Sequence, residues 1–236
     1  MYRMATKNKQ LQFASASVLA ISLCNALWLL GPWINPSISW VKQFASFYAS
    51  SCEPNYGFFR IIDIGFCLAT LIWTWLAWRQ YPKPFVVTMI LVGITTFGDA
   101  IYPAGCLTNK EVAPSFLQEL RFMHSYTSAV GFLAGLVVVS YIAYWLASLP
   151  KWRTFALVLY VINMLFILEY NYAVIVPKST IVGALQRIDI FFYSIWLLFI
   201  PMFANKKVVV EKSNNDKIAK QKVPSERVRT PKNHKS

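Results

Sequence analysis

Six long apolar stretches dominate the sequence and constrain its fold more than any other feature. They lie at about residues 11–33, 57–78, 85–102, 122–149, 152–176 and 180–204. At about 20 residues each, they are long enough to cross the hydrocarbon core of a bilayer as α-helices. Continuous apolar runs argue against a transmembrane barrel, whose strands alternate apolar and polar residues. The sequence therefore predicts an all-α fold, a bundle of six transmembrane helices.

The composition supports the membrane class. Of the 236 residues, 56% are hydrophobic and only 14% are charged, whereas soluble domains carry about 25% charged residues. The net charge of +13 does not indicate nucleic-acid binding, because ten of the 23 Lys and Arg lie in residues 206–236, after the last apolar stretch. We see no small-residue cleavage site after the first stretch, so we expect it to stay in place as a membrane anchor.

Lysine and arginine gather on one side of the predicted bundle. That side has Arg3, Lys7, Lys9, Arg79, Lys83, Lys151, Arg153, Lys206 and Lys207. The other side has Lys42, Lys110, Arg121 and Lys178, spread through longer loops. Because cytoplasmic loops are enriched in Lys and Arg, we expect a cytoplasmic N-terminus at 1–10, a membrane domain at 11–204 and a cytoplasmic C-terminus.

Two segments outside the spans allow alternative interpretations. The outer loop at 34–56 has aromatic residues at helical spacing, which fits either an amphipathic helix on the membrane surface or an ordered loop on the helix ends. The tail at 205–236 is basic and has no aromatic residue, so we expect it to be disordered. It either binds anionic lipids of the inner leaflet or serves topology alone.

Charged and polar residues inside the spans form a layer at one depth. With a rise of about 1.5 Å per residue, they lie roughly 5 to 14 Å below the outer helix ends. The layer contains Arg60, Asp63, Asp99, His124, Ser128, Glu169, Arg187 and Asp189. Each charge costs about 2.5–3.5 kcal/mol at the centre of a span, so these groups must face one another or a water-filled cavity.

Helical spacing suggests partners within this layer. Arg60 and Asp63 are three residues apart and are expected to share a helix face. His124 and Ser128 are four apart and are expected to share another. Arg187 is matched better to an acid on a neighbouring helix, such as Asp99 or Glu169.

Three interpretations of the layer stay open. It could be an ion-pair network that fixes helix packing. It could be a catalytic or metal site in which His124, with Asp63 or Asp99, activates water or binds a divalent ion. It could be a binding pocket, or a proton-coupled transport site, in which Arg60 and Arg187 clamp a lipid head group or small solute, with Glu169, Asp189 and Ser128 as further contacts. One histidine is few for zinc, and the sequence leaves the metal and any other cofactor unknown.

Cysteines are few. Cys52 precedes the second span and Cys106 follows the third, both on the predicted extracytoplasmic side. An even pair in an oxidising compartment favours a disulfide between the two outer loops. Cys24 and Cys67 lie within spans and are expected to pack as small apolar residues.

Four motifs carry a resemblance to a known family. They are FRIIDIGFCLA at 59–69, FGDAIYPAGC at 97–106, HSYTS at 124–128 and LQRIDIFFYSIWLL at 185–198. Together they resemble the bacterial integral-membrane proteins catalogued as domain of unknown function 998. The matching positions are Arg60, Asp63, Asp99, Pro103, Cys106, His124, Ser128 and Arg187.

This resemblance implies a location more than an activity. It implies a multi-pass protein of a bacterial plasma membrane, with membrane lipids as partners. Family members often have a second histidine before the one in the fourth span, and Met123 occupies that place here. The leading hypothesis is therefore an outward-facing pocket that binds a lipid head group or small polar ligand. A membrane-embedded hydrolase and a non-catalytic accessory protein are the alternatives.

Overall fold

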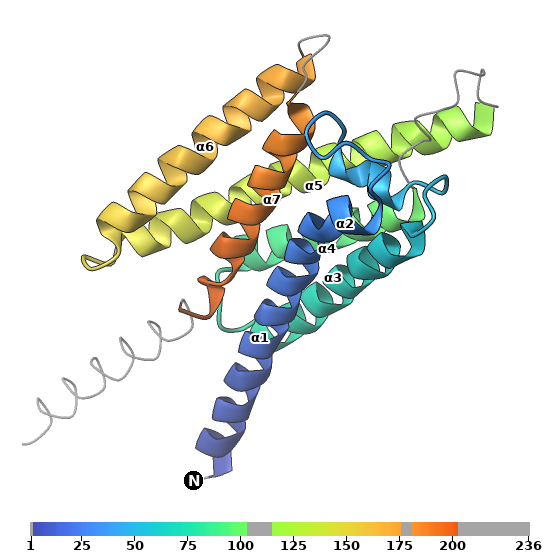
Figure 1. Ribbon diagram of the computed structural model, residues 1–236. Coiled ribbons are helices and arrows are strands. Elements are labelled where there is room, and N and C mark those ends of the chain that lie inside the picture. Colours follow the sequence, from blue (N-terminus) through green and yellow to red (C-terminus); the bar gives the residue numbers. More distant parts are fainter. Residues whose placement is uncertain (1, 103–114, 176–180, 203–236) are drawn as a thin grey trace, which may run out of the picture.

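The computed structural model describes residues 2–102, 115–175 and 181–202, and these residues form helices joined by irregular segments. The helices are α1 (Tyr2–Leu27), η1 (Trp28–Leu30), α2 (Gly31–Ile34), η2 (Ala45–Ala49), α3 (Tyr56–Ala77), α4 (Lys83–Ile101), α5 (Ser115–Ala147), α6 (Arg153–Ile175) and α7 (Val182–Leu197) (Figure 1). Six helical stretches within them are long and apolar enough to cross a membrane. The predicted six-helix, all-α fold is confirmed.

Local sequence explains how these helices begin and stay intact in an apolar surrounding. α4 begins at Lys83 directly after Pro82, and Pro84 stands in its first turn, where the missing N–H has no helical partner to lose. Hydroxyl groups inside the spans donate to carbonyl oxygens of their own helix, as Thr70 does to Phe66 at 2.8 Å. Such bonds satisfy polar side chains that the membrane cannot solvate.

The spanning helices pack as a closed ring. Going round it, α1 contacts α3, α3 contacts α4, α4 contacts α5, α5 contacts α6, α6 contacts α7, and α7 returns to α1 (Figure 1). Short turns join α3 to α4 and α5 to α6, which makes those neighbours antiparallel. The ring encloses an axis that side chains from every spanning helix can reach.

One half of the ring is filled by a packed apolar core. Its largest buried side chains include Trp73, Phe85, Met89 and Trp196, which are all fully buried. The turn between α3 and α4 closes this half, because the Tyr81 hydroxyl donates to the carbonyl of Ile200 at 3.1 Å. We call this half the packed end of the bundle.

The opposite end is covered by residues 35–55, which we call the cap. The cap is irregular apart from η2, so it is an ordered loop on the helix ends and not a continuous amphipathic helix. Ile38, Ala45, Tyr48 and Ala49 of the cap are buried. Tyr48 stacks on Phe59 of α3 with the two ring centroids 5.2 Å apart, which fixes the cap to the bundle.

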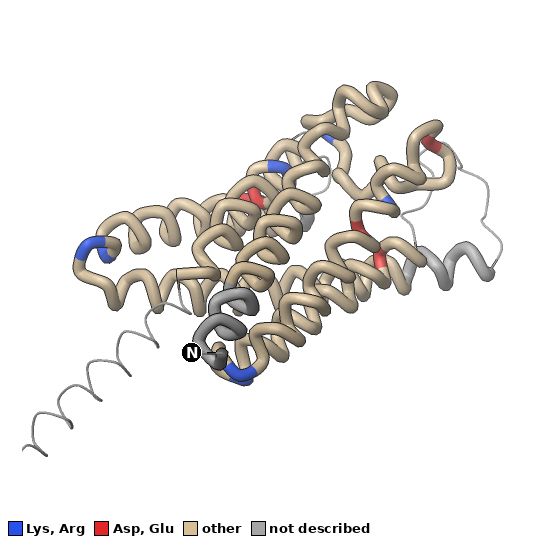
Figure 2. Tube along the Cα trace, turned by 90° about the horizontal axis from the view of Figure 1, so that it is seen from below, with Lys and Arg blue, Asp and Glu red and all other residues tan. Residues whose placement is uncertain are grey.

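Among the described residues, acids lie only toward one end of the bundle, whereas Lys and Arg lie at both ends (Figure 2). Lys and Arg mark the turns between α3 and α4 and between α5 and α6, whereas acidic residues lie farther along the helices (Figure 2). The cap end therefore holds the buried acids, and the packed end holds the basic turns. The predicted tail, together with Pro103 and Cys106, lies outside the described residues.

Candidate functional site

A cavity of about 220 Å³ lies between the packed end and the cap. Every spanning helix contributes to its wall, and Ala45, Ser46 and Ala49 of the cap line it as well. Three aspartates from three helices line the cavity, Asp63 from α3, Asp99 from α4 and Asp189 from α7. His124 and Ser128 of α5 also line it. The structure thus brings five of the predicted site residues to one space.

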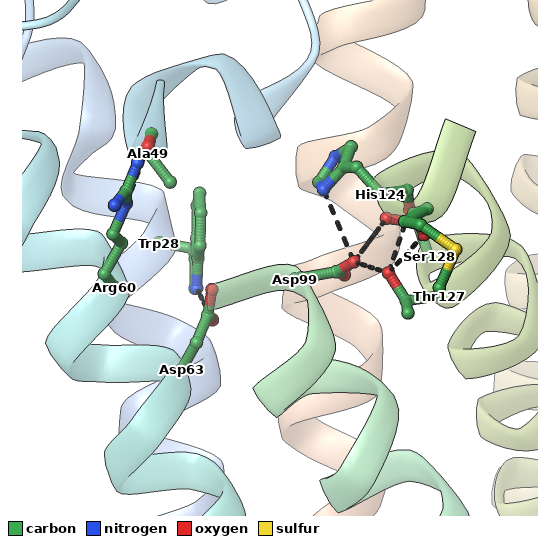
Figure 3. Close-up of polar contacts among 9 residues, drawn as sticks. Trp28, Ala49, Arg60, Asp63, Asp99, His124, Thr127 and Ser128 are labelled. Atoms are coloured by element: carbon green, nitrogen blue, oxygen red, sulfur yellow. Dashed lines mark hydrogen bonds and ion pairs between the residues drawn. The ribbon is translucent and has the colours of Figure 1, made fainter. Parts of the chain in front are cut away.

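Asp63 is the most deeply buried of the three aspartates, with 4% of its surface exposed. Its Oδ1 accepts a hydrogen bond of 2.9 Å from the indole Nε1 of Trp28 (Figure 3). A carboxylate in this position needs a donor, because an unpaired buried charge is costly. Trp28, which follows the last residue of α1, supplies that donor.

Asp99 accepts hydrogen bonds from two hydroxyl groups of α5. Ser128 donates at 3.0 Å to each carboxylate oxygen, and the Thr127 hydroxyl is a second donor, to Oδ1 (Figure 3). Gly98 makes this approach possible, since a Cβ at that position would lie 2.6 Å from Cγ2 of Thr127. The expected shared face of His124 and Ser128 is confirmed, and it points at Asp99.

His124 and Asp99 lie close together. The distance from Nδ1 of His124 to Oδ1 of Asp99 is 3.4 Å (Figure 3). That distance is long for a hydrogen bond, and Nδ1 is buried without a hydrogen-bond partner among the described residues. The imidazole therefore lies beside Asp99 with its Nδ1 not used in a hydrogen bond within the described part of the chain.

Asp189 accepts the weakest hydrogen bonding of the three aspartates among the described residues. Its Oδ1 faces Nδ2 of Asn163 on α6 at 3.4 Å, and that amide is held in turn by Trp196, whose indole donates to Oδ1 of Asn163 at 3.0 Å. One turn farther along α7, the hydroxyl of Tyr193 is buried without a hydrogen-bond partner among the described residues. This side of the cavity has unused donors and acceptors.

Arg60 does not pair with Asp63, so that expectation is wrong. Its guanidinium donates to the Ala49 carbonyl at 3.3 Å and to the Ser51 hydroxyl at 3.0 Å, and it lies 4.7 Å from the ring centre of Tyr56. Figure 3 shows Arg60 reaching toward the cap while Asp63 faces Trp28. The side chains diverge because nearby cap carbonyls offer Arg60 acceptors.

Arg187 also binds the cap and not an acid. Its Nη1 donates to the carbonyl oxygens of Trp40 and Gly183, both at 2.7 Å, and of Gln43 at 3.0 Å. Its Nη2 donates to the Tyr48 hydroxyl at 2.6 Å. Burial raises the pKa of Tyr48, while the charge and hydrogen bond of Arg187 act in the opposite direction. The expected pairing of Arg187 with Asp99 or Glu169 is wrong.

Glu169 lies outside the cavity, since it does not line it and its side chain is exposed on the bundle surface. Arg60 and Arg187 do not line the cavity either. Within the described residues, no group of three His, Cys, Asp or Glu is arranged to hold a metal ion. The wall of the cavity is therefore acidic, with no Lys or Arg among its described residues.

Several residues of the site are not identified by sequence reasoning. They are amides, hydroxyls and rings of the spans that line the cavity or serve its acids, namely Asn25, Trp28, Thr95, Asn163, Gln186 and Tyr193. Amides within apolar spans are a usable signal, because they are costly in a membrane unless they bond to something. Asn25 illustrates this, since its Nδ2 donates to the Ile190 carbonyl at 2.9 Å and to the Ser194 hydroxyl at 2.8 Å.

Together, the six apolar helices and the acid-lined cavity define a multi-pass helical membrane protein with a buried polar site. A family model described as "Protein of unknown function (DUF998)" matches residues 18–200, and the chain belongs to this family. The match includes the cap and all or most of each spanning helix, which confirms the resemblance seen in the motifs. No curated protein and no solved structure matches the chain.

Proposed function

We propose that this protein binds a small polar ligand in the cavity, and that carboxylates recognise the ligand. The observation that carries the proposal is that Asp63, Asp99 and Asp189 converge on one space of about 220 Å³ which neither Arg60 nor Arg187 lines. Pockets for drug-sized ligands span about 300–1,000 Å³. The cavity therefore fits a small molecule, or one chemical group of a larger one.

The sign of the charge determines which ligands are suitable. Carboxylates without a lining Lys or Arg create a negative potential, which the low dielectric of the surroundings strengthens. A cationic or donor-rich ligand lowers the cost of burying these acids, and an anionic ligand raises it. The proposal thus keeps the binding pocket suggested by the sequence, with Asp63, Asp99 and His124 as contacts, and replaces the arginine clamp with the acids.

The expected orientation places the cap outside the cell. The basic turns at the packed end support a cytoplasmic location for that end by the positive-inside rule. The cavity would then open toward the extracytoplasmic side of a bacterial plasma membrane, and the basic tail would face anionic inner-leaflet lipids. A disulfide between Cys52 and Cys106 would tie the cap to the loop after α4. Counting the reactive thiols of the unfolded, unreduced protein tests this disulfide. We expect two of the four cysteines to react.

Thiol labelling of a cavity residue tests the proposal without knowledge of the natural ligand. Thr96 of α4 lines the cavity, and its hydroxyl bonds only within its own helix in the described structure, to the Val92 carbonyl at 2.8 Å. In a background with Cys24→Ala and Cys67→Ala, Thr96→Cys is treated with methanethiosulfonates bearing either a trimethylammonium or a sulfonate group. When each rate is divided by the rate of the same reagent with a free thiol in solution, we expect the cationic reagent to react faster by on the order of tenfold or more at low ionic strength.

The matched control lies on the same helix. Ile94 is 54% exposed on the outer surface of the bundle, so Ile94→Cys should face lipid and react with neither reagent. A parent protein without the added cysteine gives the background. Faster reaction with the sulfonate reagent, or a Thr96→Cys as unreactive as Ile94→Cys, would refute an accessible acid-lined site. Repeating the labelling on intact cells tests the orientation.

A hydrolase is the second candidate, and the contact of His124 with Asp99 at 3.4 Å is the observation in its favour. In this mechanism Asp99 would hold the ring and His124 would take a proton from water through its other nitrogen. The test is release of head groups or fatty acids from phospholipid liposomes by purified protein. His124→Gln should reduce that release about 10²- to 10⁴-fold, and no release from the parent protein would reject this candidate. The accessory-protein hypothesis does not account for the cavity.

A further inference from the structure

We propose that the cavity contains a subsite for an alkylammonium group, formed by Asp189 and Tyr193 of α7 with Phe132 of α5. The inference rests on the proposed function, since it names the chemical class of ligand that the same cavity takes. It assigns the recognition of charge to one of the three aspartates.

The acids differ in the donors that they already have. Asp99 accepts from Thr127 and Ser128 and also contacts His124. Asp63 accepts a well-formed bond of 2.9 Å from an indole and is 4% exposed. Asp189 has a single contact of 3.4 Å among the described residues, which is too long for a strong hydrogen bond. It is therefore the carboxylate with the most capacity left for a ligand.

One aromatic ring follows Asp189 on the same face of α7, and a second ring lines the same cavity. Tyr193 is four residues farther along α7, on the same helix face, and it lines the cavity with Phe132. Tyr193 packs against the backbone of α5 at Gly135, where a Cβ would lie 3.5 Å from Cε2 of the ring. Aromatic faces attract ammonium groups, most strongly where water is excluded. A carboxylate and rings in one apolar-walled space suit a cation that carries methyl or methylene groups.

Divalent metal ions fit the same space less well. A divalent ion needs several oxygen or nitrogen ligands at about 2.0–2.6 Å, and no group of three acidic, histidine or cysteine side chains in the described ranges has that arrangement. An alkylammonium needs only one counter-ion, and its remaining surface is satisfied by aromatic and apolar walls. The unpartnered hydroxyl of Tyr193 is placed to bond a polar group next to the nitrogen.

Protection of Thr96→Cys tests the subsite with a matched pair of probes. Choline and 3,3-dimethylbutan-1-ol have nearly the same shape, and only choline is charged. A small neutral methanethiosulfonate labels the thiol, so that the reagent itself does not select by charge. We expect choline to slow labelling and the neutral alcohol at equal concentration to leave it unchanged. Equal protection by both, or no protection of a thiol that labels readily, overturns the inference and leaves the proposed function intact.

Substitutions in the cavity test which side chains are needed for choline to protect the thiol. Asp189→Asn should weaken protection by choline roughly ten- to a hundredfold, the range for loss of a charge-assisted contact. Asp99→Asn removes the same charge from the same cavity and should weaken it less. Tyr193→Phe keeps the ring and should preserve protection, whereas Tyr193→Leu should reduce it. If Asp99→Asn lost as much protection by choline as Asp189→Asn, the assignment to Asp189 would be contradicted. If a variant fails to fold, the comparison of choline with 3,3-dimethylbutan-1-ol still tests the subsite.

A second labelling experiment distinguishes a free amine from the head group of a lipid as the ligand. The Thr96→Cys protein is placed in nanodiscs of phosphatidylglycerol alone or of phosphatidylglycerol mixed with phosphatidylcholine. Slower labelling in the mixed discs without added choline indicates a lipid head group. Slower labelling in the first discs only when choline is added indicates a free solute. A thiol that cannot be labelled in either disc or in detergent would instead refute the proposed function.

Discussion

Arg187 and Asp189 are two residues apart on α7, yet they differ in how many hydrogen bonds the protein makes to their charged groups. Arg187 is 6% exposed and gives four hydrogen bonds through its two Nη atoms, with only Nε left unpaired. It also lies 4.9 Å from the ring centre of Tyr48. Asp189 faces the cavity with one long contact to Asn163. The same turn of helix thus presents to the cap a cation that gives four hydrogen bonds, and to the cavity an anion that has one long contact.

This difference separates structural from functional charge. A buried ion whose hydrogen-bonding capacity is used by its own protein holds elements together, as Arg187 holds the cap on α7. A buried ion that keeps free capacity costs stability in the empty protein and gains a partner when a ligand binds. On this basis, substitutions at the two positions should have opposite consequences for folding and for binding.

The largest effect on stability is expected for Arg187→Met. The substitution leaves the carbonyls of Trp40 and Gln43 without their donor, at about 1–3 kcal/mol for each buried acceptor. We expect the free energy of unfolding in mild detergent to fall by on the order of 4 kcal/mol. Arg60→Met is the control, because Arg60 makes two bonds near the cap surface, and it should cost about 1 kcal/mol. Equal losses in the two variants would contradict a special anchoring role for Arg187.

The second-largest loss of stability is expected for Gly98→Ala, which disturbs the contact between Thr127 and Asp99. The new Cβ would lie 2.6 Å from Cγ2 of Thr127, so α4 and α5 must separate or Thr127 must move away from Asp99. Overpacking of this kind costs about 1–3 kcal/mol, measurable as a lower unfolding temperature. Gly57→Ala in α3 meets nothing within 4 Å and should be neutral or slightly stabilising. A Gly98→Ala protein as stable as Gly57→Ala would show that this contact is not tight.

The spans and the polar layer are predictable because hydropathy and helical periodicity encode them. Apolar length gives the six helices, and the cost of charge in a membrane requires Asp63, Asp99 and His124 to face inward. The approach of Thr127 and Ser128 to Asp99 follows from the 3.6-residue repeat once α4 and α5 are neighbours. These features depend on single helices or on adjacent ones.

The arginine contacts could not be predicted in the same way. Arg60 and Arg187 bind backbone carbonyls of the cap, and the path of an irregular segment leaves no periodic signal in the sequence. Every peptide unit offers a carbonyl, so composition does not show which one an arginine will reach. Depth alone places Glu169 in the layer, but depth does not fix which side of α6 faces the ring, and the structure leaves Glu169 exposed.

Thr127→Val should have a smaller effect than Gly98→Ala because it keeps the shape of the side chain and removes one donor. Asp99 would still accept from Ser128 at 3.0 Å, so we expect a loss of about 1 kcal/mol in unfolding free energy. Thr96→Val is the matched control, since the Thr96 hydroxyl bonds within its own helix, and it should change stability by less than about 0.5 kcal/mol. A Thr127→Val protein indistinguishable from Thr96→Val would show that Asp99 does not depend on this hydroxyl.

Asp189→Asn should have the smallest effect on folding and so gives the sharpest test of the contrast with Arg187. Replacing the carboxylate removes a charge that the protein solvates poorly and keeps a side chain that can still bond Asn163. We expect the unfolding free energy to stay within about 0.5 kcal/mol of the parent or to rise, as happens when a binding residue is exchanged for a neutral one. The same variant should lose part of its preference for the cationic thiol reagent at Thr96→Cys. A loss of stability approaching that of Arg187→Met would mean that Asp189 holds the bundle together, and the cavity would then have no acid reserved for a ligand.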